Sequence, residues 1–213
     1  MQNSVKNKPA LRRYTSLPAA LHLLRNRQIT MLSPESWDDR NDAFFMRQYK
    51  ERKKFESVLA LCFTRVSETY HHWRVFTHGS DGVQIEFERD LLLAAFAKIK
   101  GIRKGTVKYR RINVATSSGP SVDELPFWKR LPYKDEKEFR IIYNSSTEAI
   151  EAKGFDLSLN CIRSITLSPW LHESLVEAVR ATIHSIDGCQ NITVIQTSLL
   201  ESGRWKDAAL PPS

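Results

Sequence analysis

The sequence predicts an α+β (mixed α/β) protein: a single domain in which a central mixed β-sheet, or two split sheets, is flanked by helices. Strand-like and helix-like segments alternate along the chain without an internal repeat. The length of 213 residues requires only one hydrophobic core. A hydrophobic content of 41% beside a charged content of 26% is typical of a soluble globular protein. No G-x-G-x-x-G or G-x-x-x-x-G-K segment indicates a dinucleotide-binding or P-loop fold.

The limits of the domain follow from composition. We expect a polar leader at residues 1–12, one globular domain at 13–200 and a frayed tail at 201–213. The N-terminus has no apolar signal-peptide core, and the most apolar segment, residues 91–97, is too short to cross a bilayer. The three cysteines match no metal-ligand spacing, which indicates free thiols in a reducing compartment. The sequence therefore predicts a cytoplasmic protein with no membrane partner, and it leaves the oligomeric state open.

Local patterns give the order of the expected elements. Ser16 and Pro18 are typical of an N-cap and a first helical turn. Residues 57–64 are apolar at nearly every position, which predicts a central strand covered on both faces. Residues 82–88 alternate, which predicts a half-buried strand. Further strands are expected at 28–32, 105–112, 138–144, 162–168 and 192–198, further helices at 44–56, 67–77 (capped by Ser67), 89–99 and 169–186, and an exposed loop at 113–124.

The charge of the chain permits polyanionic partners. The formal net charge is +8 and the isoelectric point is near 9.5. The basic residues form several separate clusters, at 52–54, 103–111 and 127–130. Such a surface fits binding of nucleic acid or a nucleotide, and it fits equally well a solvated positive surface with no polyanionic ligand.

Two other segments carry polar or aromatic side chains that could serve a site. Asp38, Asp39 and Asp42 surround Arg40 just before a predicted helix, where carboxylates either bind a cation or, as we favour, cap the helix. Residues 70–78 concentrate histidine and aromatic side chains, which could form a stacking wall for a ring or belong to the core. Adjacent histidines on a helix point in different directions, so no metal site is predicted there.

The segment "YKDEKEFRIIY", residues 133–143, places two acids close together. If it is extended, Glu136, Glu138 and Arg140 lie on one face, while Phe139 and Ile141 lie on the other. The two glutamate Cβ atoms would be roughly 7 Å apart, close enough to raise one pKa if the side chains are sheltered. On an exposed edge this pair has no consequence. In a cleft it would supply carboxylates for binding a sugar hydroxyl and for electrostatic or general-base catalysis.

Several segments in a common order resemble a bacterial and phage family, domain of unknown function 2971. The segment "HWRVFTHGSDGVQIEF" resembles the family's "MWSHYADGHKGVCIEF", and "KRLPYKDEKEFR" resembles its "K-x-x-x-W-x-x-E-x-E-x-R". The chain departs from the pattern at Arg40, Val75, Phe76 and Tyr133, where the family has proline, histidine, tyrosine and tryptophan. The matching positions are Asp39, Asp42, Trp73, Gly79, Gly82, Glu86, Phe87, Tyr109, Lys129, Glu136, Glu138 and Arg140.

A second resemblance concerns activity. The order Arg13, Phe63-Thr64 and Glu136-x-Glu138 is similar to the arginine, Ser/Thr and Glu-x-Glu pattern of ADP-ribosyltransferases. This resemblance implies NAD as a substrate and transfer to a nucleic-acid, nucleotide or protein acceptor, of which the basic surface suits the first two. The bacterial and phage setting of family 2971 suggests a role in a toxin or antiphage system. The resemblance to ADP-ribosyltransferases implies two catalytic carboxylates, with Glu138 as the principal one and Glu136 as its helper. It implies that the NAD-binding residues are Arg13, Tyr14, Thr64, Trp73, Phe76 and Arg140.

Two other functions remain open from the sequence. A non-catalytic nucleic-acid-binding module would use the basic cluster at 103–111. A metal-dependent nuclease would use Asp38, Asp39, Asp42 and the glutamates. The transferase interpretation requires that Arg13, Thr64 and Glu138, which lie far apart in the chain, meet in one cleft.

Overall fold

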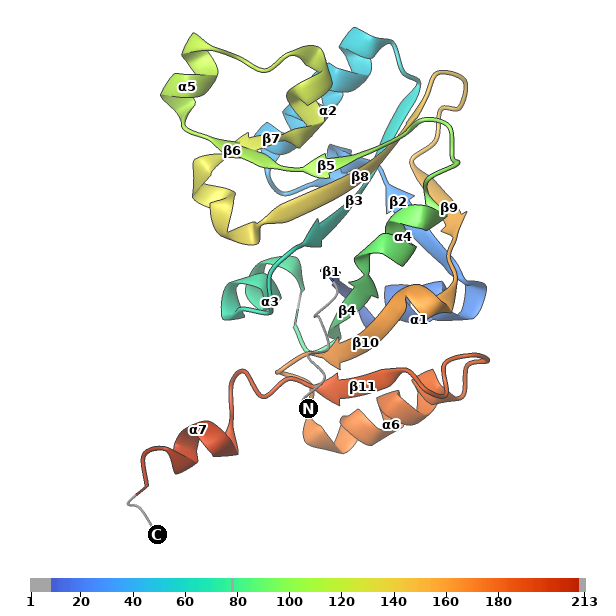
Figure 1. Cartoon of the computed structure of the whole chain (residues 1–213), viewed down its shortest axis with the longest axis vertical. Helices are drawn as coiled ribbons and strands as arrows, with labels where there is room; N and C mark the ends of the chain where they lie inside the picture. Colours follow the sequence, from blue (N-terminus) through green and yellow to red (C-terminus); the bar gives the residue numbers. More distant parts are fainter. Residues whose placement is uncertain (1–8, 78, 211–213) are drawn as a thin grey trace, which may run out of the picture.

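The computed structural model describes residues 9–77 and 79–210 (Figure 1). Most of the predicted leader, residues 1–8, and the end of the tail, 211–213, lie outside the described residues. The remainder of the leader is not a separate segment, because strand β1 begins at Ala10 and Leu11 is fully buried.

A branched, mixed β-sheet forms the centre of the molecule. Strands β11, β10, β4, β1, β3, β2 and β9 follow one another across the sheet, and β8 pairs with β3 and then with β5. The β10–β11 pair is parallel, whereas the other pairs of this sheet are antiparallel. The strands are β1 (Ala10–Ser16), β2 (Gln28–Leu32), β3 (Ser57–Thr64), β4 (Gly82–Glu88), β5 (Ile102–Thr106), β8 (Glu138–Ser145), β9 (Ala152–Asp156), β10 (Ile162–Leu167) and β11 (Thr193–Gln196).

Helices flank the sheet, and a short parallel ribbon of β6 (Lys108–Arg110) and β7 (Trp128–Arg130) lies beside β8 (Figure 1). The predicted fold class, mixed α+β with a central mixed sheet and flanking helices, is therefore confirmed. The helices are α1 (Leu17–Asn26), α2 (Arg40–Lys53), α3 (Tyr70–Phe76), α4 (Arg89–Ala95), α5 (Ile112–Ser117), α6 (Glu173–His184) and α7 (Gly203–Asp207), with short 3-10 turns η1 (Pro34–Ser36), η2 (Val122–Phe127), η3 (Leu131–Glu136) and η4 (Leu159–Cys161).

Two apolar cores lie on opposite faces of β3 and β8. Leu59 and Leu61 of β3 face the larger core, which packs against α1, α4 and α6. Val58 and Ala60 face a smaller core with Met46 and Tyr49 of α2. The prediction that residues 57–64 form a central strand covered on both faces is confirmed.

Several local predictions are wrong. Residues 82–88 were expected to form a half-buried strand, but strand β4 is buried at all but one position. It lies between β1 and β10 in the sheet, and both of its faces are covered. The strand expected at 105–112 is split between β5 and β6, and the loop expected at 113–124 contains α5 and part of η2. Thr69, not Ser67, caps α3.

Gly82 is required at its position, because a Cβ there would lie 2.5 Å from Thr77 Cβ.

Candidate active site

Glu136 and Glu138, the two acids of the segment at residues 133–143, come from different elements. Glu136 ends the 3-10 turn η3, and Lys137 then adopts a left-handed conformation with φ of 46°. Strand β8 begins only at Glu138. The expectation that Glu136, Glu138 and Arg140 share one face of an extended segment is therefore wrong for Glu136. The turn at Lys137 nevertheless brings both glutamates to the same lysine.

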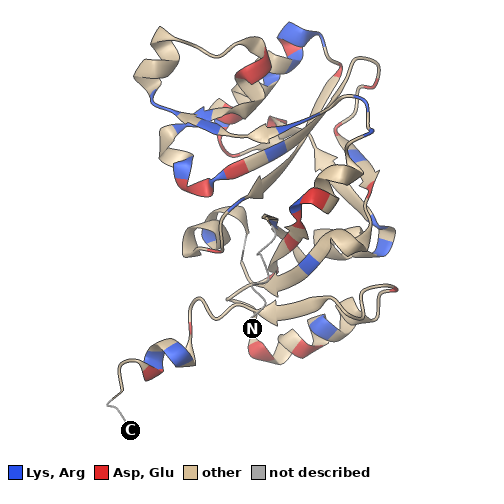
Figure 2. Ribbon diagram, in the orientation of Figure 1, with Lys and Arg blue, Asp and Glu red and all other residues tan. Residues whose placement is uncertain are grey.

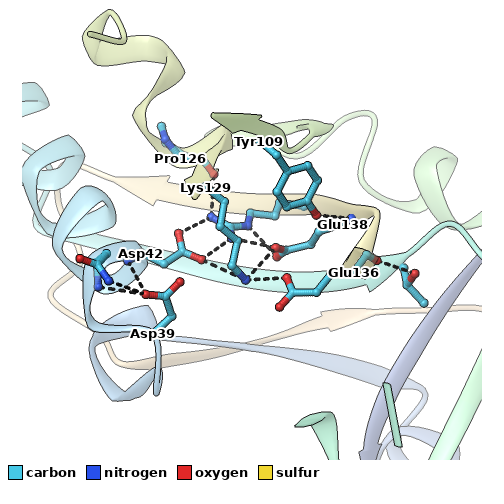
Figure 3. A network of polar contacts seen from close by, with 10 residues as sticks. Asp39, Asp42, Tyr109, Pro126, Lys129, Glu136 and Glu138 are labelled. Atoms are coloured by element: carbon cyan, nitrogen blue, oxygen red, sulfur yellow. Dashed lines mark hydrogen bonds and ion pairs between the residues drawn. The ribbon is translucent and has the colours of Figure 1, made fainter. Parts of the chain in front are cut away.

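Five charged side chains form a buried ion cluster, which we define as Asp42, Lys129, Glu136, Glu138 and Arg140 (Figure 3). Lys129 Nζ lies 2.6 Å from Glu136 Oε2, 3.4 Å from Glu138 Oε2 and 3.5 Å from Asp42 Oδ2. Arg140 donates through Nε to Glu138 Oε1 at 2.7 Å and through a terminal nitrogen to Asp42 Oδ1 at 2.8 Å. The side chain of Arg140 is fully buried. Arg140 thus orients two carboxylates from within the protein and does not face a cavity.

Backbone contacts fix the two glutamates further. The Thr64 hydroxyl donates to the Glu136 carbonyl at 2.7 Å. The Glu138 amide donates to the Tyr109 hydroxyl at 2.8 Å. Because Thr64 pairs with Glu138 across the β3–β8 ladder, the register of these two strands sets where the carboxylates lie.

The two glutamates differ in charge state. Burial disfavours a charge on Glu138, but Arg140, Lys129 and a hydrogen bond from the Cys62 thiol together outweigh it and lower the pKa of Glu138 to about 2. Burial raises the pKa of Glu136 to about 7, and the ammonium of Lys129 opposes this only in part. Near neutral pH, Glu138 is therefore an anion, while Glu136 exchanges a proton.

A cavity of about 140 Å³ lies at the junction of β1 and β3, in front of both glutamates; we call it the β1–β3 cavity. Among the predicted site residues, Arg13, Tyr14, Thr64, Phe76, Glu136 and Glu138 line it together. Two lining residues, Arg12 and Cys62, were missed by the sequence analysis, which named Phe63 only as part of the Phe63-Thr64 motif. For Cys62 a signal was available, since side chains two positions apart on a strand share a face and Thr64 was already a candidate.

The aromatic residues predicted to stack on a ligand divide into two groups. Tyr14 and Phe76 line the cavity, and their ring centroids are 6.2 Å apart. Trp73 is fully buried, and its Nε1 donates to Glu68 Oε2 at 2.8 Å. Its ring packs edge-on against Tyr14, with the ring centroids 5.1 Å apart. His72, which the sequence analysis did not select, stacks on Tyr14 with centroids 5.5 Å apart.

The remaining polar candidates have structural partners. Asp39 caps α2 by accepting from the amides of Asn41 and Asp42, as favoured above. In the basic cluster at 103–111, Arg103 contacts the Tyr49 hydroxyl and Lys108 pairs with Glu124. Lys and Arg occur on elements throughout the molecule with Asp and Glu among them (Figure 2).

Two classes of site are not seen in the described part of the chain. No group of three or more His, Cys, Asp or Glu side chains there is arranged to hold a metal ion. Likewise, no helix within residues 9–77 and 79–210 is long and apolar enough to span a membrane.

The chain has similar solved structures but no matching family model. No protein-family model matches the chain, so membership of domain of unknown function family 2971 is not confirmed. No curated protein matches it either. Among solved structures, it is similar to Thermus sp. 2.9 DarT in complex with carba-NAD+ (TM-score 0.47, 10% identity, 90% of this chain and 96% of that chain) and with ADP-ribosylated ssDNA (0.48, 10%, 92% and 98%). At TM-scores below 0.5 this similarity carries no argument about chemistry, and the inferences below rest on the geometry of this chain.

Proposed function

We propose that the chain is an NAD-dependent ADP-ribosyltransferase-like enzyme of the cytoplasm, with the β1–β3 cavity as its NAD site. The observation that carries the proposal is that Arg13, Thr64, Glu136 and Glu138 line one cavity. These residues are separated by up to 125 positions in the chain, and strands β1, β3 and β8 bring them together.

Glu138 is suited to stabilise the transition state of glycosidic cleavage. When the bond from C1′ of the ribose to the nicotinamide nitrogen breaks, its electron pair goes to the ring and positive charge develops on the sugar. Glu138 is ionised at neutral pH and is held in place by Arg140. Its contacts with Arg140, Lys129 and the Cys62 thiol occupy the roughly four lone-pair positions of a carboxylate, so we assign Glu138 an electrostatic role toward the sugar and not a direct hydrogen bond to it. A fixed anion at that place lowers the barrier without reorganisation.

Glu136 is suited to activate the acceptor. With a pKa of about 7 it accepts a proton at the pH at which the enzyme works. The acceptor's nucleophilic atom forms the new bond to C1′, and its proton passes to Glu136. Lys129, 2.6 Å from the Glu136 carboxylate, holds that base toward the cavity.

The volume of the cavity limits what it can enclose. At about 140 Å³ it is smaller than the roughly 300 Å³ at which sites for whole small ligands begin, so we assign to it the nicotinamide and its ribose. Tyr14 and Phe76 offer ring faces for the nicotinamide. Arg13 donates one hydrogen bond to the Cys62 carbonyl, and its guanidinium has further donors for a phosphate.

The acceptor is the least defined part of the proposal. The net charge of +8 favours an anionic acceptor, a nucleic acid or nucleotide, over a protein. Modification of such an acceptor would suit a toxin or an antiphage system.

The direct test compares the wild type with Glu138→Gln. Purified protein is incubated with NAD carrying a labelled ADP-ribose group, together with cell extract, oligonucleotides or nucleotides, and released nicotinamide is measured. We expect Glu138→Gln to lower nicotinamide release by about 100-fold or more, because it removes the charge that faces the ribose.

Asp42→Asn is the matched control. Asp42 contacts the same arginine and lysine as Glu138 but does not line the β1–β3 cavity. It therefore reports the effect of disturbing the ion cluster alone. Absence of nicotinamide release by the wild type with every acceptor class, or equal losses in the two variants, would overturn the proposal.

A further inference from the structure

A second, larger cavity lies on the other side of the ion cluster. It has a volume of about 280 Å³ and lies between helix α2, helix α5 and the β6–β7 ribbon; we call it the α2–β7 cavity. Asp42 and Lys129 of the ion cluster belong to its wall, whereas Glu136 and Glu138 belong to the wall of the β1–β3 cavity. The two cavities are thus separate, with the ion cluster between them.

Two polar atoms in the wall of the α2–β7 cavity have no hydrogen-bond partner among the described residues. One is the indole donor Nε1 of Trp128, a residue that is only 7% exposed. The other is the acceptor Oδ2 of Asp39, whose Oδ1 caps helix α2. Buried polar groups in native proteins are nearly always paired with protein atoms, ordered water or a ligand, so these two buried atoms are places beside the cavity where a ligand or an ordered water would supply a partner.

The rest of the wall combines cations with flat apolar surfaces. Arg130 is exposed at the rim, and the Arg110 guanidinium lies 5.3 Å above the Trp128 ring. Phe45 is half-buried in the wall, and Ile112 of α5 is 72% exposed beside it. Arginine suits phosphate because its fork of donors matches phosphate oxygens, and both phenyl rings and guanidinium planes stack on nucleobases.

We propose that the α2–β7 cavity binds a nucleotide, with its phosphate at Arg130 and its base between Phe45 and Arg110. The base presents an acceptor to Trp128 Nε1 and a donor to Asp39 Oδ2, a combination that the nucleobases carry on their edges. This site is distinct from the proposed NAD site and does not depend on transferase chemistry. A free nucleotide and a nucleotide within a strand share this chemistry.

The test is isothermal titration of the whole chain with AMP, GMP, CMP and UMP, and with single-stranded oligonucleotides. We expect at least one nucleoside monophosphate or oligonucleotide to bind. Arg130→Gln should weaken binding by about tenfold, and Trp128→Phe, which keeps a ring but removes the N–H donor, by about fivefold. Binding of the free monophosphate identifies a soluble ligand, and binding only of the oligonucleotide identifies a strand.

Three further measurements make the result specific. Arg111→Gln removes one positive charge, as Arg130→Gln does, from the residue that follows Arg110 in the chain. Arg111 does not line the cavity, so this variant should leave nucleotide binding unchanged. Arg12→Gln, which removes a charge from the wall of the β1–β3 cavity, should also leave nucleotide binding unchanged, which separates this site from the proposed transferase site. Nicotinamide, which belongs to the proposed β1–β3 site and carries no phosphate, should not displace the nucleotide. The proposal is overturned if nothing binds, if Arg111→Gln weakens binding as much as Arg130→Gln does, or if nicotinamide competes.

Discussion

Two groups of charged side chains on the same sheet differ in how the protein encloses them. The ion cluster around β8 is closed over by α2, β7 and η3, and its side chains are at most 8% exposed. Arg12, Glu86 and Arg163, which we call the outer ion pairs, lie across β1, β4 and β10 with side chains 18–26% exposed. Both groups contain an ion pair with a nitrogen-to-oxygen distance of 2.8 Å or less.

Because its side chains are so much less exposed, the ion cluster loses more hydration on folding than the outer ion pairs do. Removing several charges from water is costly, and apolar residues of similar volume would fill the same space at least as favourably. The outer ion pairs keep much of their hydration, and their net contribution is small. The sheet therefore carries this costly group of buried charges between two cavities, which is consistent with a functional role.

The largest expected effect comes from Arg140→Met. Without the guanidinium, Asp42 and Glu138 remain buried with only Lys129 beside them. We expect the free energy of unfolding to fall by about 3–5 kcal/mol, measured by urea denaturation. Arg140→Lys is the control, since it keeps the charge but loses the forked contacts with both carboxylates, and it should cause a smaller loss. Equal losses in the two variants would show that charge is not the reason for the effect.

The next largest expected effect is a dependence of the free energy of unfolding on pH. The pKa of Glu136 is about 7 in the folded protein against 4.5 ordinarily, so folding favours its protonated form. Its contribution to stability is fully present below about pH 4.5 and is lost as pH rises through 7. Relative to Glu136→Gln, the wild type should lose about 1 kcal/mol per pH unit between about pH 5 and 7 and level off above this range.

Chemical denaturation of both proteins in a series of buffers measures this difference. Groups other than Glu136 titrate in both proteins, so their contributions cancel in the subtraction. Parallel stability curves from pH 4.5 to 8 would show that the pKa of Glu136 is not raised.

The smallest effect is expected in the outer ion pairs. Glu86→Gln removes the carboxylate 2.8 Å from Arg12 and 3.5 Å from Arg163, but water can replace much of the interaction. We expect a loss of at most about 1 kcal/mol in urea denaturation, decreasing further at high salt. A loss as large as that of Arg140→Met would remove the contrast between the two groups.

Much of the fold could be predicted from local pattern, because long apolar or alternating segments reflect burial directly. The strand at β3 and the cap of α1 by Ser16 are examples. Failures occurred where a distant neighbour decides the structure. Residues 82–88 alternate, yet both faces of β4 are covered by parts of the chain that no local window includes. The strand β7 has only three residues, too few to show a period.

The sequence predicted some of the residues that line the β1–β3 cavity, but not how their neighbours hold them. Glu136, Glu138 and Arg13 were selected from a motif order, and the structure brings them to one cavity. That Arg140 is fully buried and paired with Asp42, 98 positions away, depends on how α2 packs on β8, which the local sequence does not encode. The left-handed turn at Lys137 was equally invisible, since lysine has no preference for it.

The way in which β1 meets β3 has a consequence for motion. These strands pair through a single residue pair, Arg12 with Thr64, whereas β3 and β8 pair along eight positions. The β1–β3 cavity lies at this sparse junction. A displacement of β1 relative to β3 at this junction would break only this one pair of the hydrogen-bonded ladder. The β3–β8 ladder meanwhile stays intact and keeps Glu138 in register with Thr64.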